Sequence, residues 1–407
     1  MPLPQSHNVS KPKVLLFFRR YASSFTAYSW IFGRCGRIEV HTMAPETHPI
    51  RHSKWVDQHL VFESDGELVE RLVAALEEGG YDALICLDEP AREIVLEHRD
   101  HPTLKPYLPF AEGSPLFEAA VNKVKFQQWC AELGFDSPKS FYCSTREEVQ
   151  NAVAKFDYPF VLKGAHGAGG QQVHIVENEK TLASLLHDVE GSPGEEWIVQ
   201  EYLTGAVGTT IFVARGGRLY AHCSVKNRVC MYGGIGPSAI CEFVVDPEFE
   251  RIAQAMAEHV DGLTGVDWMQ HEDGRYLLID PHLGRATPNA VIAHMDGVDF
   301  GDAMYRALSG QAPSVPVPQN SGKKVWLMPK SLNLIFEGRL GAALRVANPF
   351  SRNVRVFFAG KREWRLFAAL TFEVLSGNLR VLLGRIRRNM FQSKTSDRVE
   401  PDISNEG

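Results

Sequence analysis

The residues best suited to chemistry begin with a lysine that precedes a glycine-rich loop. Lys163 ends an apolar run at residues 160–163, and GAHGAGG follows it at residues 164–170. Glycine and alanine let backbone amides approach a polyanion without obstruction by side chains, so the segment favours phosphate as a ligand. An ordinary turn is the alternative, because the loop contains neither GxGxxG nor GxxxxGK(S/T). The interpretation therefore depends on the residues that accompany the loop.

Two acidic residues, Asp267 and Asp280, occupy opposite arms of a predicted β-hairpin. Apolar runs at 266–271 and 276–280 flank EDGR at residues 272–275, a turn of the Asp-Gly type. A turn at that centre brings both carboxylates toward one end of the sheet, and hard oxygen ligands suit magnesium. A solvated or paired surface charge is the alternative for each acid, although the apolar neighbours on both strands weigh against it.

The order of these motifs resembles the ATP-grasp superfamily over residues 117–310. Asn122-Lys123 followed by GFDSP at 134–138 is similar to the family's opening motif, and VQEYL at 199–203 resembles its hinge. Residues 160–170 resemble its second lysine and phosphate loop. The resemblance implies ATP as a cofactor, with the phosphates contacted by Lys123, Lys163, Gly167, Ala168, Gly169 and Gly170 and the adenine by Glu201, Tyr202 and Leu203.

The same resemblance implies a metal, Mg2+ (or Mn2+), bound by Asp267 and Asp280, with His282 where the family usually has asparagine. DPHLGR at residues 280–285 departs from the family pattern, because the second acid is shorter and the arginine comes one position later. Val207 stands where many members place a ribose-binding glutamate. The metal geometry and the ribose contacts are therefore the features in which this chain leaves the pattern.

The activity that the resemblance implies is ATP-dependent ligation, in which a carboxylate becomes an acyl phosphate and an amine or similar nucleophile attacks it. Arg285 is the predicted grip on the acceptor carboxylate, since a guanidinium can pair with it bidentately. Lys226 is the predicted second catalytic residue, with surface charge as its alternative. Two other functions fit the same motifs: an ATP-binding protein without ligase activity, in a regulatory or scaffold role, and an ATP-grasp kinase.

The elements that position these residues predict an α/β fold. Apolar runs at 13–18, 37–41 and 81–87, with a helical pattern at 67–78, indicate parallel strands joined by helices. They predict a Rossmann-like domain whose strand ends, at Asp88-Glu89, form one wall of the acceptor site. The complete division is an N-terminal α/β domain at 1–115, an ATP-grasp α+β domain at 116–310, a proline-rich linker at 311–324 and a helical, basic C-terminal extension at 325–407.

The pattern within the second domain predicts several individual elements. A helix at 116–133 is followed by strands at 160–163, 172–176 and 196–201, with a helix at 181–189 before the last strand. Strands at 210–214 and 219–224 flank the turn RGGR and predict a hairpin. Helical spacing over 248–263 precedes the acidic hairpin.

Bulk composition limits the partners. The 407 residues include 44% hydrophobic residues and carry a formal charge of -6, so there is no basic bias toward nucleic acid. The ATP-grasp resemblance implies small-molecule or conjugate carboxylates and amines as the substrates. Seven dispersed cysteines without a CxxC pair indicate reduced thiols. The start of the chain lacks the apolar stretch of a signal peptide, so we expect a cytoplasmic protein, with a place at the inner face of a membrane as the open alternative.

The C-terminal residues 361–388 combine apolar and basic side chains. Such a mixture suits peripheral contact with an anionic membrane surface. The alternative is a pair of helices, broken at Ser376-Gly377, that pack on the body and expose a basic face.

Overall fold

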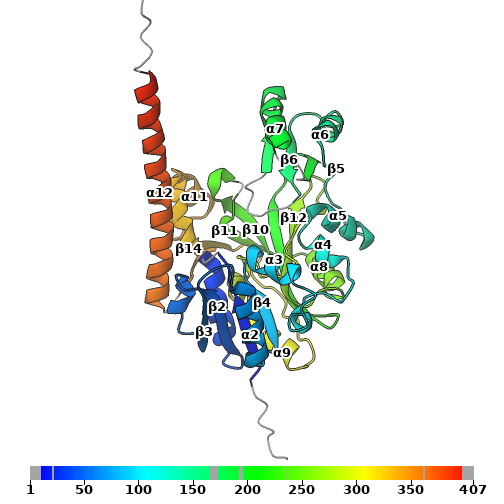
Figure 1. Ribbon diagram of the computed structural model, residues 1–407, viewed down its shortest axis with the longest axis vertical. Coiled ribbons are helices and arrows are strands. Elements are labelled where there is room, and N and C mark those ends of the chain that lie inside the picture. The colour runs from blue at the N-terminus through cyan, green and yellow to red at the C-terminus, as the bar shows by residue number, and fades with distance from the viewer. Residues whose placement is uncertain are drawn as a thin grey trace, which may run out of the picture.

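The computed structural model describes residues 11–20, 23–165, 173–191, 196–234, 236–360 and 363–396 of the chain. Three β-sheets organise them (Figure 1): an N-terminal four-stranded sheet, a central seven-stranded sheet and a second four-stranded sheet. The α/β class predicted from the sequence is confirmed. All seven cysteines are free, as predicted.

The N-terminal sheet is parallel, with the order β3-β2-β1-β4. Its helix α2 buries Leu68, Leu72 and Leu76, which recur every four residues and therefore share one face of the helix. The predicted parallel start of the chain is confirmed. The elements are β1 (Lys13–Phe17), α1 (Ala27–Gly33), β2 (Glu39–Pro45), β3 (Gln58–Phe62), α2 (Leu68–Gly79), β4 (Ala83–Cys86) and α3 (Glu89–Glu97).

The central sheet has the order β13-β12-β9-β10-β11-β14-β15. Alternate residues of β9 enter different cores: Ile211 and Val213 join one cluster, and Phe212 and Ala214 join the other. Each face of the sheet is therefore covered. The strands are β9 (Val207–Arg215), β10 (Arg218–Cys230), β11 (Ser238–Val244), β12 (Gly262–Gln270), β13 (Tyr276–Pro281), β14 (Lys324–Met328) and β15 (Val354–Phe358).

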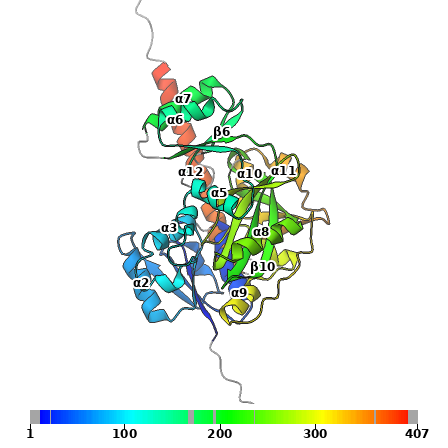
Figure 2. The same cartoon turned by 90° about the vertical axis from the view of Figure 1, so that its right-hand side faces the viewer.

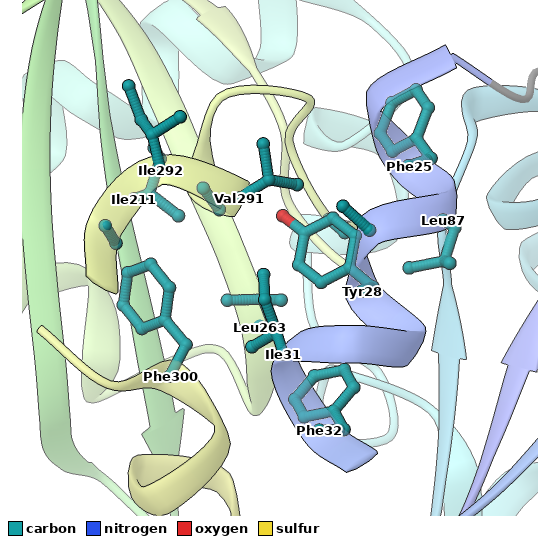
Figure 3. Close-up of a cluster of buried hydrophobic side chains, with 14 of the residues drawn as sticks. Phe25, Tyr28, Ile31, Phe32, Leu87, Ile211, Leu263, Val291, Ile292 and Phe300 are labelled. Carbon is teal, nitrogen blue, oxygen red and sulfur yellow. The ribbon is translucent and has the colours of Figure 1, made fainter. Parts of the chain in front are cut away.

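One of these cores joins the N-terminal domain to the central sheet. Figure 3 shows Tyr28 and Ile31 of α1 facing Leu263 and Val291 across this interface. The Tyr28 hydroxyl donates a hydrogen bond of 2.6 Å to the backbone carbonyl of Thr287. The N-terminal domain is thus packed against the sheet that carries the acidic hairpin.

The second four-stranded sheet has the order β5-β8-β6-β7 and is antiparallel. Figure 2 shows it, with α6 and α7, as a layer beyond one end of the central sheet. The predicted strands at 160–163, 172–176 and 196–201 and the helix at 181–189 are confirmed. The elements are β5 (Ser140–Cys143), α6 (Arg146–Val153), β6 (Phe160–Gly164), β7 (Val173–Val176), α7 (Glu179–Gly191) and β8 (Trp197–Glu201).

Two predicted helices were too long. The helix expected at 116–133 divides into α4 (Leu116–Ala119) and α5 (Lys123–Glu132), because the Asn122 side chain accepts hydrogen bonds from the first backbone amides of α5 and starts a new helix. The helix expected at 248–263 ends as α8 (Pro247–Ala257), and the amide of Asp261 donates to Pro109 O at 2.8 Å instead. Strand β12 then begins at Gly262, where φ is +96°.

The C-terminal region is more than the helical extension that was predicted. Strand β14 pairs with β11 and with β15, so the central sheet continues beyond residue 324. A single helix, α12 (Trp364–Ser396), runs through Ser376-Gly377, and the predicted break there is wrong. The remaining elements are η1 (Ser23–Thr26), η2 (Pro49–His52), η3 (Lys105–Tyr107), η4 (Tyr232–Gly234), η5 (Ala290–Asp296), α9 (Phe300–Leu308), η6 (Lys330–Leu332), α10 (Asn333–Phe336) and α11 (Leu340–Val346). No helix within the described ranges is long and apolar enough to cross a membrane.

Candidate functional site

The acidic hairpin has the geometry that the sequence predicted. Asp267 on β12 and Asp280 on β13 are register partners in an antiparallel pair, so both carboxylates leave the same face of the sheet. Thr209 on β9 is the register partner of Asp267 on its other side, and its hydroxyl donates to Asp267 Oδ1 at 2.6 Å. Thr209 was missed from the sequence, because only the strand pairing reveals that it faces this carboxylate.

Lys123 approaches the same hairpin from the start of α5. The Asn122 cap fixes the helix start, and the backbone amide of Lys123 donates to Ala165 O at 3.2 Å. The Lys123 ammonium lies 3.6 Å from Asp280 Oδ1. One of the two predicted phosphate lysines is therefore adjacent to a predicted metal acid.

Lys163 reaches the site from the smaller antiparallel sheet. It lies on β6 between Val173 of β7 and Ile198 of β8, and it is only 7% exposed. Burial lowers the pKa of Lys163 to about 8; the negative charge of Asp280 opposes this shift, and the positive charge of Lys123 adds to it. Lysines from two different layers thus act on one carboxylate.

His282 is the partner of Asp267. Its Nε2 lies 2.9 Å from Asp267 Oδ1. Burial alone would raise the pKa of Asp267, but the charge and hydrogen bond of His282, the hydrogen bond of Thr209 and the charge of Arg285 together lower it. Asp267 is therefore held as a carboxylate at neutral pH.

The residues present fit a magnesium ion that is shared with phosphate. Across the described part of the chain, no group of three or more His, Cys, Asp and Glu side chains is arranged to hold a metal. Magnesium on a nucleotide typically uses one or two protein carboxylates and takes its other ligands from phosphates and water. The carboxylates of Asp267 and Asp280 meet that requirement, and His282 as a third ligand stays a prediction.

Arg285 belongs to a buried charge cluster at the junction with the N-terminal domain. Its guanidinium lies 3.3 Å from Glu89 Oε2, and Arg92 lies 3.0 Å from Glu89 Oε1. Arg92 also donates to Leu283 O at 3.4 Å. Burial alone would raise the pKa of Glu89, but the charges of Arg285 and Arg92, followed by those of His282 and Lys123, lower it. Glu89 therefore carries charge into this site.

The strand end at Asp88-Glu89 serves two purposes. The Asp88 carboxylate caps α3 through the Ala91 amide at 2.9 Å and also accepts the Arg20 amide at 2.7 Å, so it is structural. Glu89 is the member that turns to Arg285. Arg92, one helical turn after Glu89, was not predicted, although its (i, i+3) spacing from an acid at a strand end was a usable signal.

The predicted hinge residues connect two sheets. Glu201 ends β8, and its Oε1 accepts the Lys139 amide at 2.8 Å. Tyr202 and Leu203 lie in the connection to β9. Gly205 in this connection has no room for a side chain, because a Cβ there would lie 1.6 Å from Gln270 O. The hinge and its adenine contacts stay predictions.

Lys226, a predicted catalytic residue, does not lie on the face of the sheet that carries the acidic pair. It pairs with Gly208 of β9 and Glu242 of β11, one position out of step with the row of Thr209 and Asp267. Neighbouring rows of a sheet face opposite sides, so Lys226 leaves the sheet on the other face. The predicted loop residues Gly167, Ala168, Gly169 and Gly170 lie outside the described residues.

Known proteins are similar to this chain in sequence. Residues 120–282 match the model of the ATP-grasp domain family. The chain is 23% identical over 192 residues to the carbamoyl phosphate synthase large chain of Helicobacter pylori, and this match covers 43% of the chain but 18% of that protein. It is 24% identical over 325 residues to the formate-dependent phosphoribosylglycinamide formyltransferase of Bacteroides thetaiotaomicron, covering 75% of the chain and 76% of the relative.

Solved structures show the same fold. The biotin carboxylase domain of the Hydrogenobacter thermophilus 2-oxoglutarate carboxylase, in complex with MgADP, ADP and bicarbonate, aligns with a TM-score of 0.60 at 15% identity over 77% of this chain and 73% of that chain. At this identity the likeness concerns the fold. The matched family model identifies an ATP-grasp domain over residues 120–282 of this chain.

Proposed function

We propose that the protein is an ATP-dependent ligase that activates a carboxylate as an acyl phosphate for attack by an amine or a similar nucleophile. The observation that carries the proposal is the convergence of Lys123 and Lys163, from different layers, on Asp280 beside the ionised Asp267. The two lysines face two carboxylates of the central sheet. This arrangement suits a metal-bound polyphosphate, because phosphoryl transfer depends on charge neutralisation.

Each residue then has an electrostatic role. Lys123 and Lys163 neutralise the phosphates, while Asp267 and Asp280 would hold Mg2+ (or Mn2+), which would supply charge stabilisation to the transferred phosphoryl group. Gly167, Ala168, Gly169 and Gly170 stay the proposed phosphate contacts of the loop. Glu201, Tyr202 and Leu203 receive the adenine, where the hinge joins the two sheets.

The acceptor site follows from the buried cluster at the N-terminal domain. Arg285 is the proposed carboxylate grip, and Glu89 Oε2 lies 3.3 Å from its guanidinium. Arg92 also pairs with Glu89, so the negative charge of Glu89 stays paired if Arg285 turns to the carboxylate of the acceptor substrate. Lys226 has weaker support as a catalytic residue, because its row faces the other side of the sheet.

An ATP-binding protein without ligase activity is the second candidate. One observation favours it: His282 pairs with Asp267, and Lys123 pairs with Asp280, so each proposed metal ligand has a cationic or hydrogen-bonding partner within the chain. A kinase with the same fold uses the same nucleotide site, so only its product distinguishes it from a ligase.

Product analysis tests the proposal. Purified protein is incubated with Mg-ATP and pools of amino acids, polyamines and sugar acids, and ADP, phosphate and new conjugates are measured. A ligase releases ADP and free phosphate together with an amide or related conjugate. A phosphorylated product would instead assign a kinase, and ATP binding without turnover in any pool would support the scaffold role.

The lowered pKa of Lys163 predicts a pH dependence of nucleotide affinity. The protonated ammonium binds phosphate, and with its pKa at about 8 the free protein loses that charge as the pH rises above 8. We expect the Kd for ATP to increase by up to about tenfold per pH unit there. Calorimetric titrations from pH 7 to pH 9.5 measure it.

Lys163→Arg is the matched control, because its guanidinium stays charged over this range. Its affinity should be flat in pH, whatever its absolute value. A wild-type affinity that is constant up to pH 9.5 would contradict the assigned contact.

We also propose a cytoplasmic location. The seven cysteines are free thiols and most of them are buried, which suits the reducing conditions of a cytoplasm.

A further inference from the structure

Helix α12 uses one face to attach to the body. Leu366 and Leu370 are buried in the core that joins the N-terminal domain to the central sheet. Further along the helix, the Asn378 side-chain amide donates a hydrogen bond of 2.6 Å to Asn333 Oδ1 of α10. The helix contacts η2, η6 and α10, and Figure 1 shows it along one edge of the molecule. Only part of its circumference is therefore covered.

A second face of α12 exposes large apolar side chains. Trp364 is 75% exposed and Phe372 is 72% exposed, and Leu375, Leu379 and Leu383 are exposed as well. These five residues follow one another at intervals of eight, three, four and four, so they form a single stripe on the helix. The stripe is offset from the face of Leu366 and Leu370. We call these five residues the outer stripe.

The helix also concentrates positive charge. Trp364–Ser396 contains six Lys or Arg residues and one acidic residue, in a chain whose formal charge is -6. The Arg365 guanidinium lies 5.5 Å from the ring centroid of Trp364, and Arg380 follows Leu379 of the outer stripe. Basic groups thus accompany the apolar ones at both ends of the described stripe.

The exposed apolar stripe and the positive charge of α12 favour one of two candidate partners, a second copy of the chain or an anionic bilayer. A second copy of the chain would bring two sets of basic residues together, and each helix offers a single acid against them, so charge disfavours pairing. An anionic bilayer satisfies both features, because its acyl boundary takes the aromatic and aliphatic side chains and its headgroups take the arginines. None of the described helices can span a bilayer, so the helix would lie on its surface.

We propose that α12 docks the protein on the surface of an anionic lipid bilayer, with the outer stripe in the acyl boundary and Arg365 and Arg380 at the headgroups. Leu366 and Leu370 keep the helix fixed to the body. The ATP-grasp domain is thereby held at the membrane surface. This role is independent of the reaction that the ATP site performs.

Vesicle flotation of the full-length protein tests the proposal. We expect it to float with vesicles of phosphatidylcholine mixed with phosphatidylserine, to stay soluble with phosphatidylcholine alone, and to be released by high salt. The combined variant Phe372→Ser, Leu375→Ser and Leu379→Ser should lose flotation. Arg380→Glu should weaken partition into the anionic vesicles by about tenfold or more.

Matched controls separate docking from general surface effects. Val317→Ser removes an apolar side chain that is 74% exposed outside α12, and Arg218→Glu reverses an exposed charge on the β9–β10 turn; both should float as wild type does. Circular dichroism melting confirms that each variant is folded. Loss of flotation in a folded stripe variant alone supports the proposal.

Two results would overturn it. The first is wild-type protein that remains soluble with anionic vesicles. The second is a dimer, measured by multi-angle light scattering without lipid, that becomes a monomer in the stripe variant, since the outer stripe would then be covered by a second copy.

Discussion

Replacement of Lys163 by alanine is expected to weaken ATP binding by about 10- to 100-fold, the effect of losing a charged hydrogen bond. Turnover with an acceptor found by product analysis should fall by about 10² or more, because a preorganised cation would be absent as charge develops on the transferred phosphoryl group. Burial of this ammonium is unfavourable, as its pKa of about 8 shows, and strongly perturbed pKa values are typical of functional sites. Calorimetry and ADP release measure the two effects.

Lys180→Ala is the matched control for this variant. Lys180 lies in α7 of the same layer and is exposed, so its loss removes an equal charge without removing a contact in the site. Both variants should unfold at similar temperatures. Equal ATP turnover in Lys163→Ala and Lys180→Ala would remove Lys163 from the site.

Asp280→Asn is expected to abolish the contribution of magnesium while leaving metal-free nucleotide binding intact or slightly tighter. The amide is a poorer magnesium ligand than the carboxylate, and its neutrality removes the attraction between residue 280 and the Lys123 ammonium, which lies 3.6 Å from Asp280 in the wild type. A loss of several kcal/mol of charge stabilisation corresponds to about 10² to 10³ in turnover. Titrations of ATP with magnesium and with EDTA separate the two effects.

Asp273→Asn serves as its control, because Asp273 lies in the exposed turn of the same hairpin and pairs with Arg275. It should retain the wild-type response to magnesium. If Asp280→Asn also responds to magnesium as wild type does, Asp280 is not a metal ligand and its role is confined to the ion pair with Lys123.

Local patterns predicted the parts of the site that depend on neighbouring residues. The Asp-Gly turn was enough to place Asp267 and Asp280 on opposite arms of one hairpin. Their direct pairing also depends on a register shift between Asp267 and Trp268, which local alternation does not reveal. The apolar run before Lys163 placed that lysine in the last residues of a strand.

Contacts between distant segments were beyond local patterns. Glu89 and Arg285 are separated by 196 residues, and only the packing of the N-terminal domain on the central sheet brings them together. Lys226 shows a different limit, because the register of β10 against its neighbours decides its face and the strand contains irregular pairings after Asn227. The motif order alone carried no information on that register.

The C-terminal region shows how composition and structure differ. Prolines at 311–324 predicted a linker before a separate extension, yet β14 begins at Lys324 and pairs with β11 of the central sheet. A strand of five residues gives a weak periodic signal, and its pairing partner lies some eighty residues earlier in the chain. The predicted domain boundaries stay predictions.

The most direct test of the central claim is a calorimetric titration of the wild-type protein and the double variant Lys123→Ala, Lys163→Ala with ATP, in magnesium and in EDTA. The account predicts that wild type binds ATP and that magnesium tightens binding, whereas the double variant, still folded, binds weakly in both buffers. Wild type that fails to bind ATP, or a double variant that binds it as tightly as wild type, would contradict a Mg-ATP site built from the two lysines and the acidic pair.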